Sequence, residues 1–171
     1  MRASRSPPSL QPSARSSAMG HGWLARVPRG LSLNGRRLLI VEDEVFVAMD
    51  IAFTCEVAGA EVTGTTTVRS ALDAIGEADL ENRPFDAALL DLAVRDGTTE
   101  RVADALRKRR VPFLVYTGEA RDGNGLAEQF GVRILAKPMP VEEIALGIAG
   151  LLKGVGTDAA RTADAPSASP G

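Results

Sequence analysis

Four short polar groups in the sequence each follow an apolar run, and their side chains are the ones that could do chemistry. The first group is a run of acids, the second is a single Asp, the third supplies a hydroxyl and the fourth an ammonium group. In chain order they are Glu42-Asp43-Glu44, Asp91, Thr117-Gly118 and Lys137-Pro138. If the fold brings these groups together, the carboxylates repel one another unless a cation lies among them.

Oxygen ligands without His or Cys favour Mg²⁺, which binds one or two protein carboxylates together with phosphate oxygens. The Thr117 hydroxyl and the Lys137 ammonium would complete a site for a tetrahedral dianion. Positioning and charge neutralisation of this kind are most of what phosphoryl transfer requires. Asp91 is then the candidate nucleophile, because a carboxylate can form an aspartyl phosphate.

Composition excludes several other kinds of chemistry. The chain of 171 residues has one Cys and one His, which rules out a disulfide framework, a multi-thiolate metal site and a His-clustered metal site. Residues 1–37 carry seven Arg and no acid, so the remainder of the chain is acidic. An acidic body argues against nucleic-acid binding. The longest nearly pure apolar stretch, 144–152, is far shorter than the roughly 20 residues of a membrane helix.

The elements that must position these groups alternate five times between short apolar runs and helical periodicity. Strands are predicted at 38–41, 61–65, 86–90, 113–116 and 132–136, and helices at 44–58, 68–75, 102–106, 126–130 and 141–152. Phe46, Met49, Phe53 and Val57 give the first helix its period. Apolar side chains on both faces of the strands are typical of a parallel sheet that helices cover on both sides.

The predicted fold is therefore an α/β, doubly wound, five-stranded parallel sheet of (βα)5 flavodoxin-like type, with strand order 2-1-3-4-5. Ligands in such sheets bind beyond the carboxyl ends of the strands, where the strand order reverses. All four polar groups follow strands, so we expect them to meet at that edge.

Two tails are expected to flank this domain. Residues 1–34 are rich in Ser, Pro, Gly and Arg, lack an apolar period and are expected to be disordered, with Met19 as a plausible true start. The ordered domain is expected to span 36–153, with a second disordered tail at 154–171 and no output domain after it. Deletion of residues 1–34 is accordingly expected to leave thermal stability almost unchanged.

The four groups and the strands before them, at 38–44, 88–92, 115–118 and 136–138, together resemble the receiver domain of two-component response regulators, of the stand-alone single-domain type. The resemblance covers about 36–153. It implies that Glu42 and Asp43 hold Mg²⁺ together with Asp91, and that Ala93 contributes its backbone carbonyl to the metal.

For the phosphoryl group, the resemblance implies that Asp91 accepts it from the histidine of a kinase or of a histidine phosphotransfer protein. Thr117 matches the hydroxyl residue that bonds the phosphoryl group, and Lys137 matches the Lys that pairs with it. The Lys137-Pro138 bond is cis in this family. The resemblance implies a two-state switch, in which phosphorylation shifts the conformation of the face made by the fourth strand, the helix after it, the fifth strand and the last helix.

The expected function is thus a bacterial, cytoplasmic phosphoacceptor that signals through protein contacts. Its expected partners are the kinase or phosphotransfer protein and a downstream protein, with no nucleic acid and no membrane. A homodimer through the face just named is possible for receivers of this type. We expect no enzyme activity beyond Mg²⁺-dependent autophosphorylation from phosphodonors and autodephosphorylation.

Three positions depart from the family pattern. Arg95 stands where Pro is usual, Ile134 stands where Tyr or Phe is common, and Met139 replaces an aromatic residue often found after the Lys-Pro pair. Arg95 and Ile134 motivate an alternative, a pseudo-receiver that binds proteins without phosphorylation. A flavin carrier or a haloacid-dehalogenase-like phosphatase fits poorly, because acids follow the first strand and Ala93 lacks the second carboxylate that the phosphatase needs.

Overall fold

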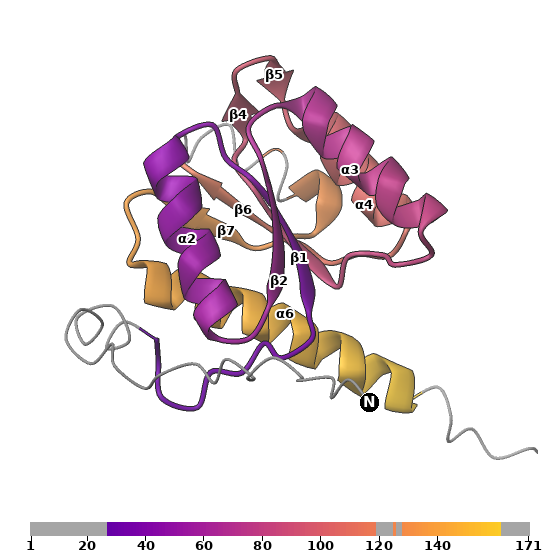
Figure 1. Ribbon diagram of the computed structural model, residues 1–171. Coiled ribbons are helices and arrows are strands. Elements are labelled where there is room, and N and C mark those ends of the chain that lie inside the picture. Colours follow the sequence, from indigo (N-terminus) through magenta and orange to yellow (C-terminus); the bar gives the residue numbers. More distant parts are fainter. Residues whose placement is uncertain (1–26, 119–124, 126–127, 162–171) are drawn as a thin grey trace, which may run out of the picture.

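A computed structural model describes residues 27–118, 125 and 128–161 of the chain. One parallel sheet forms the centre of the molecule. Its five strands lie in the order β2-β1-β3-β6-β7 (Figure 1). Their bounds are β1 Arg37–Val41, β2 Glu61–Thr65, β3 Ala87–Leu90, β6 Phe113–Thr117 and β7 Ile134–Ala136. With β6 and β7 as the fourth and fifth strands, this confirms the predicted order and the flavodoxin-like α/β class.

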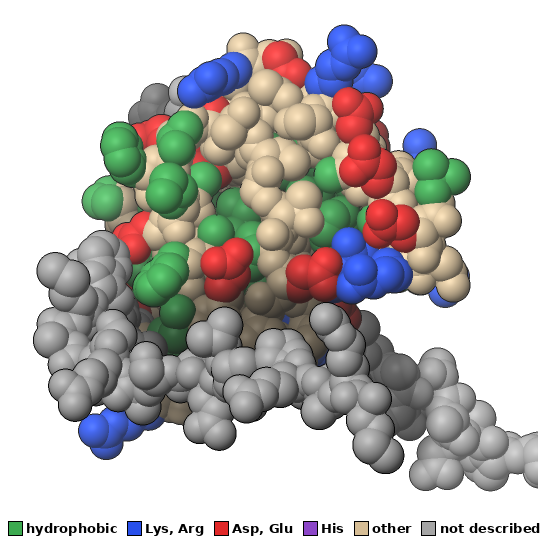
Figure 2. Space-filling model, viewed as in Figure 1, with side chains coloured by type: hydrophobic (Ala, Val, Ile, Leu, Met, Phe, Trp, Pro, Cys, Tyr) green, Lys and Arg blue, Asp and Glu red, His purple; other side chains and the backbone are tan. Residues whose placement is uncertain are grey.

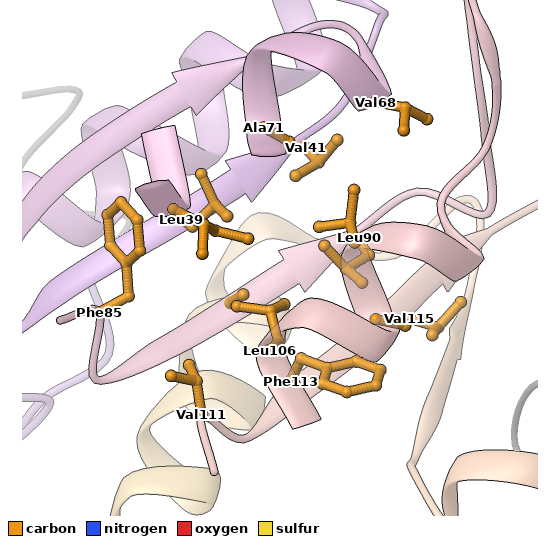
Figure 3. Close-up of a cluster of buried hydrophobic side chains, with 14 of the residues drawn as sticks. Leu39, Val41, Val68, Ala71, Phe85, Leu90, Leu106, Val111, Phe113 and Val115 are labelled. Carbon is orange, nitrogen blue, oxygen red and sulfur yellow. The ribbon is translucent and has the colours of Figure 1, made fainter. Parts of the chain in front are cut away.

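Helices cover both faces of this sheet. The helices α2 (Val45–Val57) and α6 (Val141–Arg161) lie together on one face, and α3 (Val68–Leu80) and α4 (Glu100–Lys108) lie together on the other. Strand side chains point alternately to opposite faces. Accordingly, Leu39 and Val41 join the cluster under α3 and α4, drawn in Figure 3, whereas Leu38 joins the cluster under α2 and α6. The central strands β1, β3 and β6 are apolar on both sides for this reason, whereas the edge strand β2 is polar and less buried.

The helix α2 forms where the sequence predicts a helix, but it turns the unexpected face to the core. Its buried residues are Ile51, Thr54 and Cys55. The stripe that gave the helix its period is exposed instead, and with Val45 it consists of Phe46, Met49, Phe53 and Val57. Because α2 is apolar on both sides, periodicity locates the helix without selecting the face that is buried.

The predicted N-terminal tail is too long. Leu33 is only 1% exposed, and its N–H donates a 2.8 Å hydrogen bond to the carbonyl of Ala58. Val27 and Leu31 pack against the same apolar cluster. The expectation of disorder is therefore wrong for 27–34, because three apolar residues in an otherwise polar segment are enough to anchor it. Residues 1–26 lie outside the described residues.

At the other end, α6 runs to Arg161, beyond the predicted helix end at 152 and into the segment 154–171 that was expected to be disordered. The part of the segment within α6 contains no Pro and includes Ala159-Ala160, residues with high helix propensity. A helix can therefore continue there although no apolar period marks it. Residues 162–171 lie outside the described residues.

A short antiparallel hairpin after β3 was not predicted. Its strands are β4 (Ala93–Val94) and β5 (Gly97–Thr98), and Val94 pairs with Gly97 across a turn made by Arg95 and Asp96. Gly97 has φ 139°, a value that favours glycine. Strands of two residues are too short to show a period in the sequence.

The fourth predicted helix, 126–130, falls partly outside the described residues, and 128–130 are helical. Among the helices of the described ranges, none is long and apolar enough to cross a membrane.

Candidate functional site

The register of the parallel sheet brings the first two polar groups together. Val41 pairs with Leu90, and the N–H of Asp91 donates a 2.8 Å hydrogen bond to the carbonyl of Val41. The next residues along β1 and β3 are therefore neighbours. Each of Glu42, Asp43 and Asp91 offers a carboxylate oxygen, and these oxygens lie within 4.8 Å of one another. The predicted acidic cluster is present at the predicted edge.

Lys137 reaches this cluster from the end of β7. Its N–H donates a 2.9 Å hydrogen bond to the carbonyl of Thr117, which keeps the ends of β6 and β7 together. Its Nζ lies 2.7 Å from Asp91 Oδ2 and 2.8 Å from Glu42 Oε2. The Lys137-Pro138 peptide bond is cis, as the resemblance implied. One ammonium group thus bridges two of the three clustered carboxylates.

Burial and charge act in opposite directions on this pair of groups. Glu42 is 1% exposed, and its burial raises the pKa of the carboxyl, although the hydrogen bonds from Lys137 and from the Glu44 N–H act to lower it. Burial also acts against the charged form of Lys137, but the hydrogen bonds with Asp91 and Glu42 outweigh it and raise the pKa of the ammonium group. Lys137 is therefore held as a cation inside the site.

These residues fit a divalent cation. Among the residues that the structure describes, three clustered carboxylates face the ammonium group of Lys137, so these side chains together carry an excess of negative charge. Lys137 Nζ donates its hydrogen bond to Glu42 Oε1 at 3.0 Å, whereas the buried Glu42 Oε2 lies 2.8 Å from Nζ without hydrogen-bond geometry. Oε2 is thus ion-paired but, within the described part of the chain, accepts no hydrogen bond, and a metal ion would bind this lone pair. The hard oxygen donors of Glu42, Asp43 and Asp91 suit Mg²⁺.

Two further predicted residues lie nearby. Thr117 ends β6, is 2% exposed and pairs with Ala136, the residue before Lys137. Ala93 lies in β4, two residues beyond Asp91, and its own side chain is exposed. The part of Ala93 as a backbone ligand of the metal stays a prediction.

Sequence reasoning missed two residues of this region. Thr99 is completely buried, and its Oγ1 donates a 2.7 Å hydrogen bond to the main-chain carbonyl of Asp91. A Thr just before a helix is ordinary capping chemistry in a sequence, so no pattern singles it out. Tyr116 is a second contact that was not predicted, since Lys137 Nζ lies 5.1 Å from the centre of its ring.

Comparison with known proteins supports the fold through structure rather than sequence. No protein-family model and no curated protein matches the chain. A CheY-like response regulator receiver domain from Methanospirillum hungatei JF-1 superposes with a TM-score of 0.61 at 23% identity, over 72% of this chain and 98% of that one. A response regulator receiver domain from Clostridium thermocellum gives 0.62 at 19% identity, over 71% and 98%.

The response regulator protein TrrA from Thermotoga maritima, solved in complex with Mg²⁺ and BeF, gives a TM-score of 0.57 at 18% identity, over 68% of this chain and 99% of that one. At these identities the likeness concerns the fold. The chain has the fold of response regulator receiver domains, and the strand ends that carry the polar groups form its candidate site.

Proposed function

We propose that this protein is a phosphoacceptor receiver, in which Asp91 takes a phosphoryl group from a phosphohistidine in a Mg²⁺-dependent reaction. The observation that carries the proposal is the geometry around Lys137: its Nζ lies 2.7 Å from Asp91 Oδ2, inside a cluster of three carboxylates that fits a divalent cation. An unusual concentration of paired and buried charge of this kind is typical of functional sites.

In the proposed reaction, an Asp91 carboxylate oxygen attacks phosphorus and forms an acyl phosphate. The P–N bond to the donor histidine breaks, and the imidazole nitrogen leaves with its electron pair. Bound Mg²⁺ would neutralise charge on the phosphoryl oxygens. Glu42 and Asp43 would hold the ion, the Lys137 ammonium would pair with the phosphoryl group, and the Thr117 hydroxyl would donate a hydrogen bond to it.

The donor protein must contact the rim of this site, because its histidine must reach Asp91. The exposed stripe of α2 begins at Val45, directly after the acidic run. Phe46 is 87% exposed and Met49 is 62% exposed, and Figure 2 shows apolar side chains gathered over α2. Large exposed apolar patches mark protein contacts. We place the histidine kinase or histidine phosphotransfer protein on this stripe.

A downstream protein, or a second copy of the chain, would bind the face made by β6, the helix predicted after it, β7 and α6. The proposal places the protein in the cytoplasm of a bacterium, without nucleic acid as a ligand and without enzyme activity on another substrate. The alternative is a pseudo-receiver that binds partners without phosphorylation. Arg95 and Ile134 favour it, since the family has Pro and an aromatic residue at these positions.

One experiment separates the two. The protein is incubated with Mg²⁺ and acetyl phosphate, and intact-mass spectrometry follows the addition of a phosphoryl group. Wild type is expected to gain one phosphoryl group, and EDTA is expected to prevent this. Asp91→Asn is expected to gain none. Asp86→Asn is the matched control, because Asp86 lies just before β3, at the amino-terminal ends of the strands and away from Asp91. No labelling of wild type, or equal labelling of Asp91→Asn, would refute the proposed function.

A further inference from the structure

Thr99 occupies the N-cap position of α4 but does not act as a cap. Within the described residues, its side chain makes no capping hydrogen bond to α4. Thr67, at the same position of α3, accepts a 3.0 Å hydrogen bond from the N–H of Ser70 in the ordinary way. The Thr99 hydroxyl instead donates to the Asp91 carbonyl at 2.7 Å. A good capping interaction is thus given up for a contact with the candidate phosphoacceptor.

Thr99 also closes the loop that begins at Asp91. Its N–H donates to the carbonyl of Leu92 at 2.9 Å, and its hydroxyl lies 3.4 Å from the same oxygen. The hairpin of β4 and β5 lies between these two ends. Thr99 is therefore bonded to two successive carbonyls, those of residue 91 and residue 92. These carbonyls immediately precede Ala93, which is the expected backbone ligand.

The tip of the hairpin is anchored separately. Asp96 Oδ1 accepts a 2.6 Å hydrogen bond from the N–H of Val68, and its Oδ2 accepts a 3.1 Å hydrogen bond from the N–H of Arg69. The loop from 91 to 99 is thus fixed to α4 at its base and to α3 at its tip. With the tip held by Asp96, the path of the main chain beside the Asp91 carboxylate depends on the bonds at the base.

We infer that Thr99 is a positioning residue for the acceptor site: its hydroxyl holds the main chain of residues 91–93 in the conformation that binds Mg²⁺ and presents the Asp91 carboxylate to phosphorus. The inference rests on the proposed function. Small displacements in a site of this kind reduce rates strongly, because catalysis by positioning depends on pre-organised geometry. Thr99 itself touches neither the metal nor the phosphoryl group in this role.

The test compares Thr99→Val, which keeps the shape and removes the hydroxyl, with Thr99→Ser, which keeps the hydroxyl. Thr54→Val is the matched control, since Thr54 is also buried and its hydroxyl donates a 2.9 Å hydrogen bond to a main-chain carbonyl, that of Asp50 in α2. Each variant is measured for its free energy of unfolding, for Mg²⁺ dissociation constant by calorimetry, and for phosphorylation rate by acetyl phosphate at saturating Mg²⁺.

Thr99→Val is expected to bind Mg²⁺ about tenfold more weakly and to react about tenfold more slowly, the scale of one lost buried hydrogen bond. Thr99→Ser is expected to restore both values to nearly those of wild type. Thr54→Val is expected to lose similar stability with no change in either value. If Thr99→Val does not fold, Thr99→Ala against Thr54→Ala makes the same comparison.

The inference is overturned if Thr99→Val and Thr54→Val have the same Mg²⁺ affinity and rate, or if Thr99→Ser fails to rescue. These outcomes differ from a failure of the proposed function, which would appear as an unlabelled wild type. In that case the metal titration alone decides, and a wild type that binds no Mg²⁺ overturns the inference as well.

Discussion

At the scale of single residues, Lys137 balances the charge of the site. Its ammonium group is paired with Asp91 and Glu42, and the more exposed Glu44 lies farther away at 3.5 Å. Only 17% of the Lys137 side chain is exposed, so water screens its attraction to the two carboxylates only weakly. Among the described residues the site needs a cation at this point, because three clustered carboxylates would otherwise lie together without a counter-charge.

Lys137→Ala is accordingly expected to give a folded protein that is impaired in phosphorylation. Without metal, its free energy of unfolding should fall by about 3 kcal/mol, as expected when one partner of a buried ion pair is removed. Urea unfolding and labelling by acetyl phosphate measure the two effects. Lys108→Ala, at an exposed position of α4, is the control. Labelling and stability equal to those of Lys108→Ala would contradict the assigned part of Lys137.

At the same scale, the sequence was sufficient to predict Glu42, Asp43, Asp91 and Lys137 as one cluster. The reason is geometric, since parallel strands end at the same edge of a sheet and each of these residues follows a strand. Thr99 could not be found in this way. Its contact depends on the direction of one hydroxyl, which capping preferences predict wrongly.

At the scale of elements, α2 is the helix whose buried face differs from the one that its sequence pattern predicted. Its period predicted the helix correctly and the buried face wrongly, because Ile51 and Cys55 form a second apolar stripe. Which of the two stripes is buried depends on the elements that pack against α2, namely α6 and the strands. The sequence of α2 alone carries no information about those elements. The hairpin of β4 and β5 escaped prediction for a similar reason, since pairing rather than composition defines it.

The outward stripe of α2 leads to a prediction about the donor protein. Phe46→Ser is expected to slow phosphotransfer from a phosphorylated histidine phosphotransfer domain about tenfold, because exposed aromatic anchors dominate the binding energy of such contacts. Labelling by acetyl phosphate should not change. Leu80→Ser in α3 removes an equally exposed apolar residue, 90% exposed, away from the site. Equal phosphotransfer by both variants would show that the donor does not dock on α2.

The pair α3 and α4 is joined by a charge contact that gives a pH prediction. Arg109 Nε and Nη2 donate to Asp79, and the shortest N–O distance is 2.6 Å. Hydrogen bonding from Arg109 lowers the pKa of the Asp79 carboxyl below its ordinary value. A lowered pKa in the folded state means that the contribution to stability is present above the unfolded pKa and is lost as pH falls through the folded pKa.

Asp79→Asn should therefore be less stable than wild type at neutral pH, and the difference should shrink as pH falls below about 4. Chemical unfolding between pH 2.5 and 7 tests this. Asp104→Asn, which removes an exposed pair with Arg107 within α4, is the comparison and should show a smaller difference. A difference for Asp79→Asn that stays constant over this pH range would exclude the pair as its source.

At the scale of the whole molecule, the domain is longer at both ends than its composition indicated. Leu33 closes one end of the cluster under α2 and α6, and its segment is bonded to the turn after α2 through Ala58 and Gly59. In that turn Gly59 has φ 98°, and a Cβ there would collide with the side chain of Asn34 and lie 3.0 Å from its Cα. The chain before β1 is thus fitted closely to the body, which a polar composition hides.

Two truncated chains distinguish these boundaries. Residues 27–171 are expected to unfold at the temperature of the full chain, whereas residues 35–171 should lose about 2 kcal/mol or more, the contribution of one fully buried Leu side chain. Differential scanning calorimetry gives both values. Equal melting temperatures for the two chains would restore the original expectation that residues 1–34 contribute nothing to stability.

The two hydrogen bonds from α3 to Asp96 also have a practical use. The amides of Val68 and Arg69 are far from Asp91 in sequence, yet their bonds are to the same loop that leaves the acceptor. The hydrogen-exchange rates of these two amides, measured by NMR, therefore report whether the loop stays bonded to α3. If phosphorylation of Asp91 moves this loop, the hydrogen bonds to Asp96 are expected to break and the two amide protons to exchange faster.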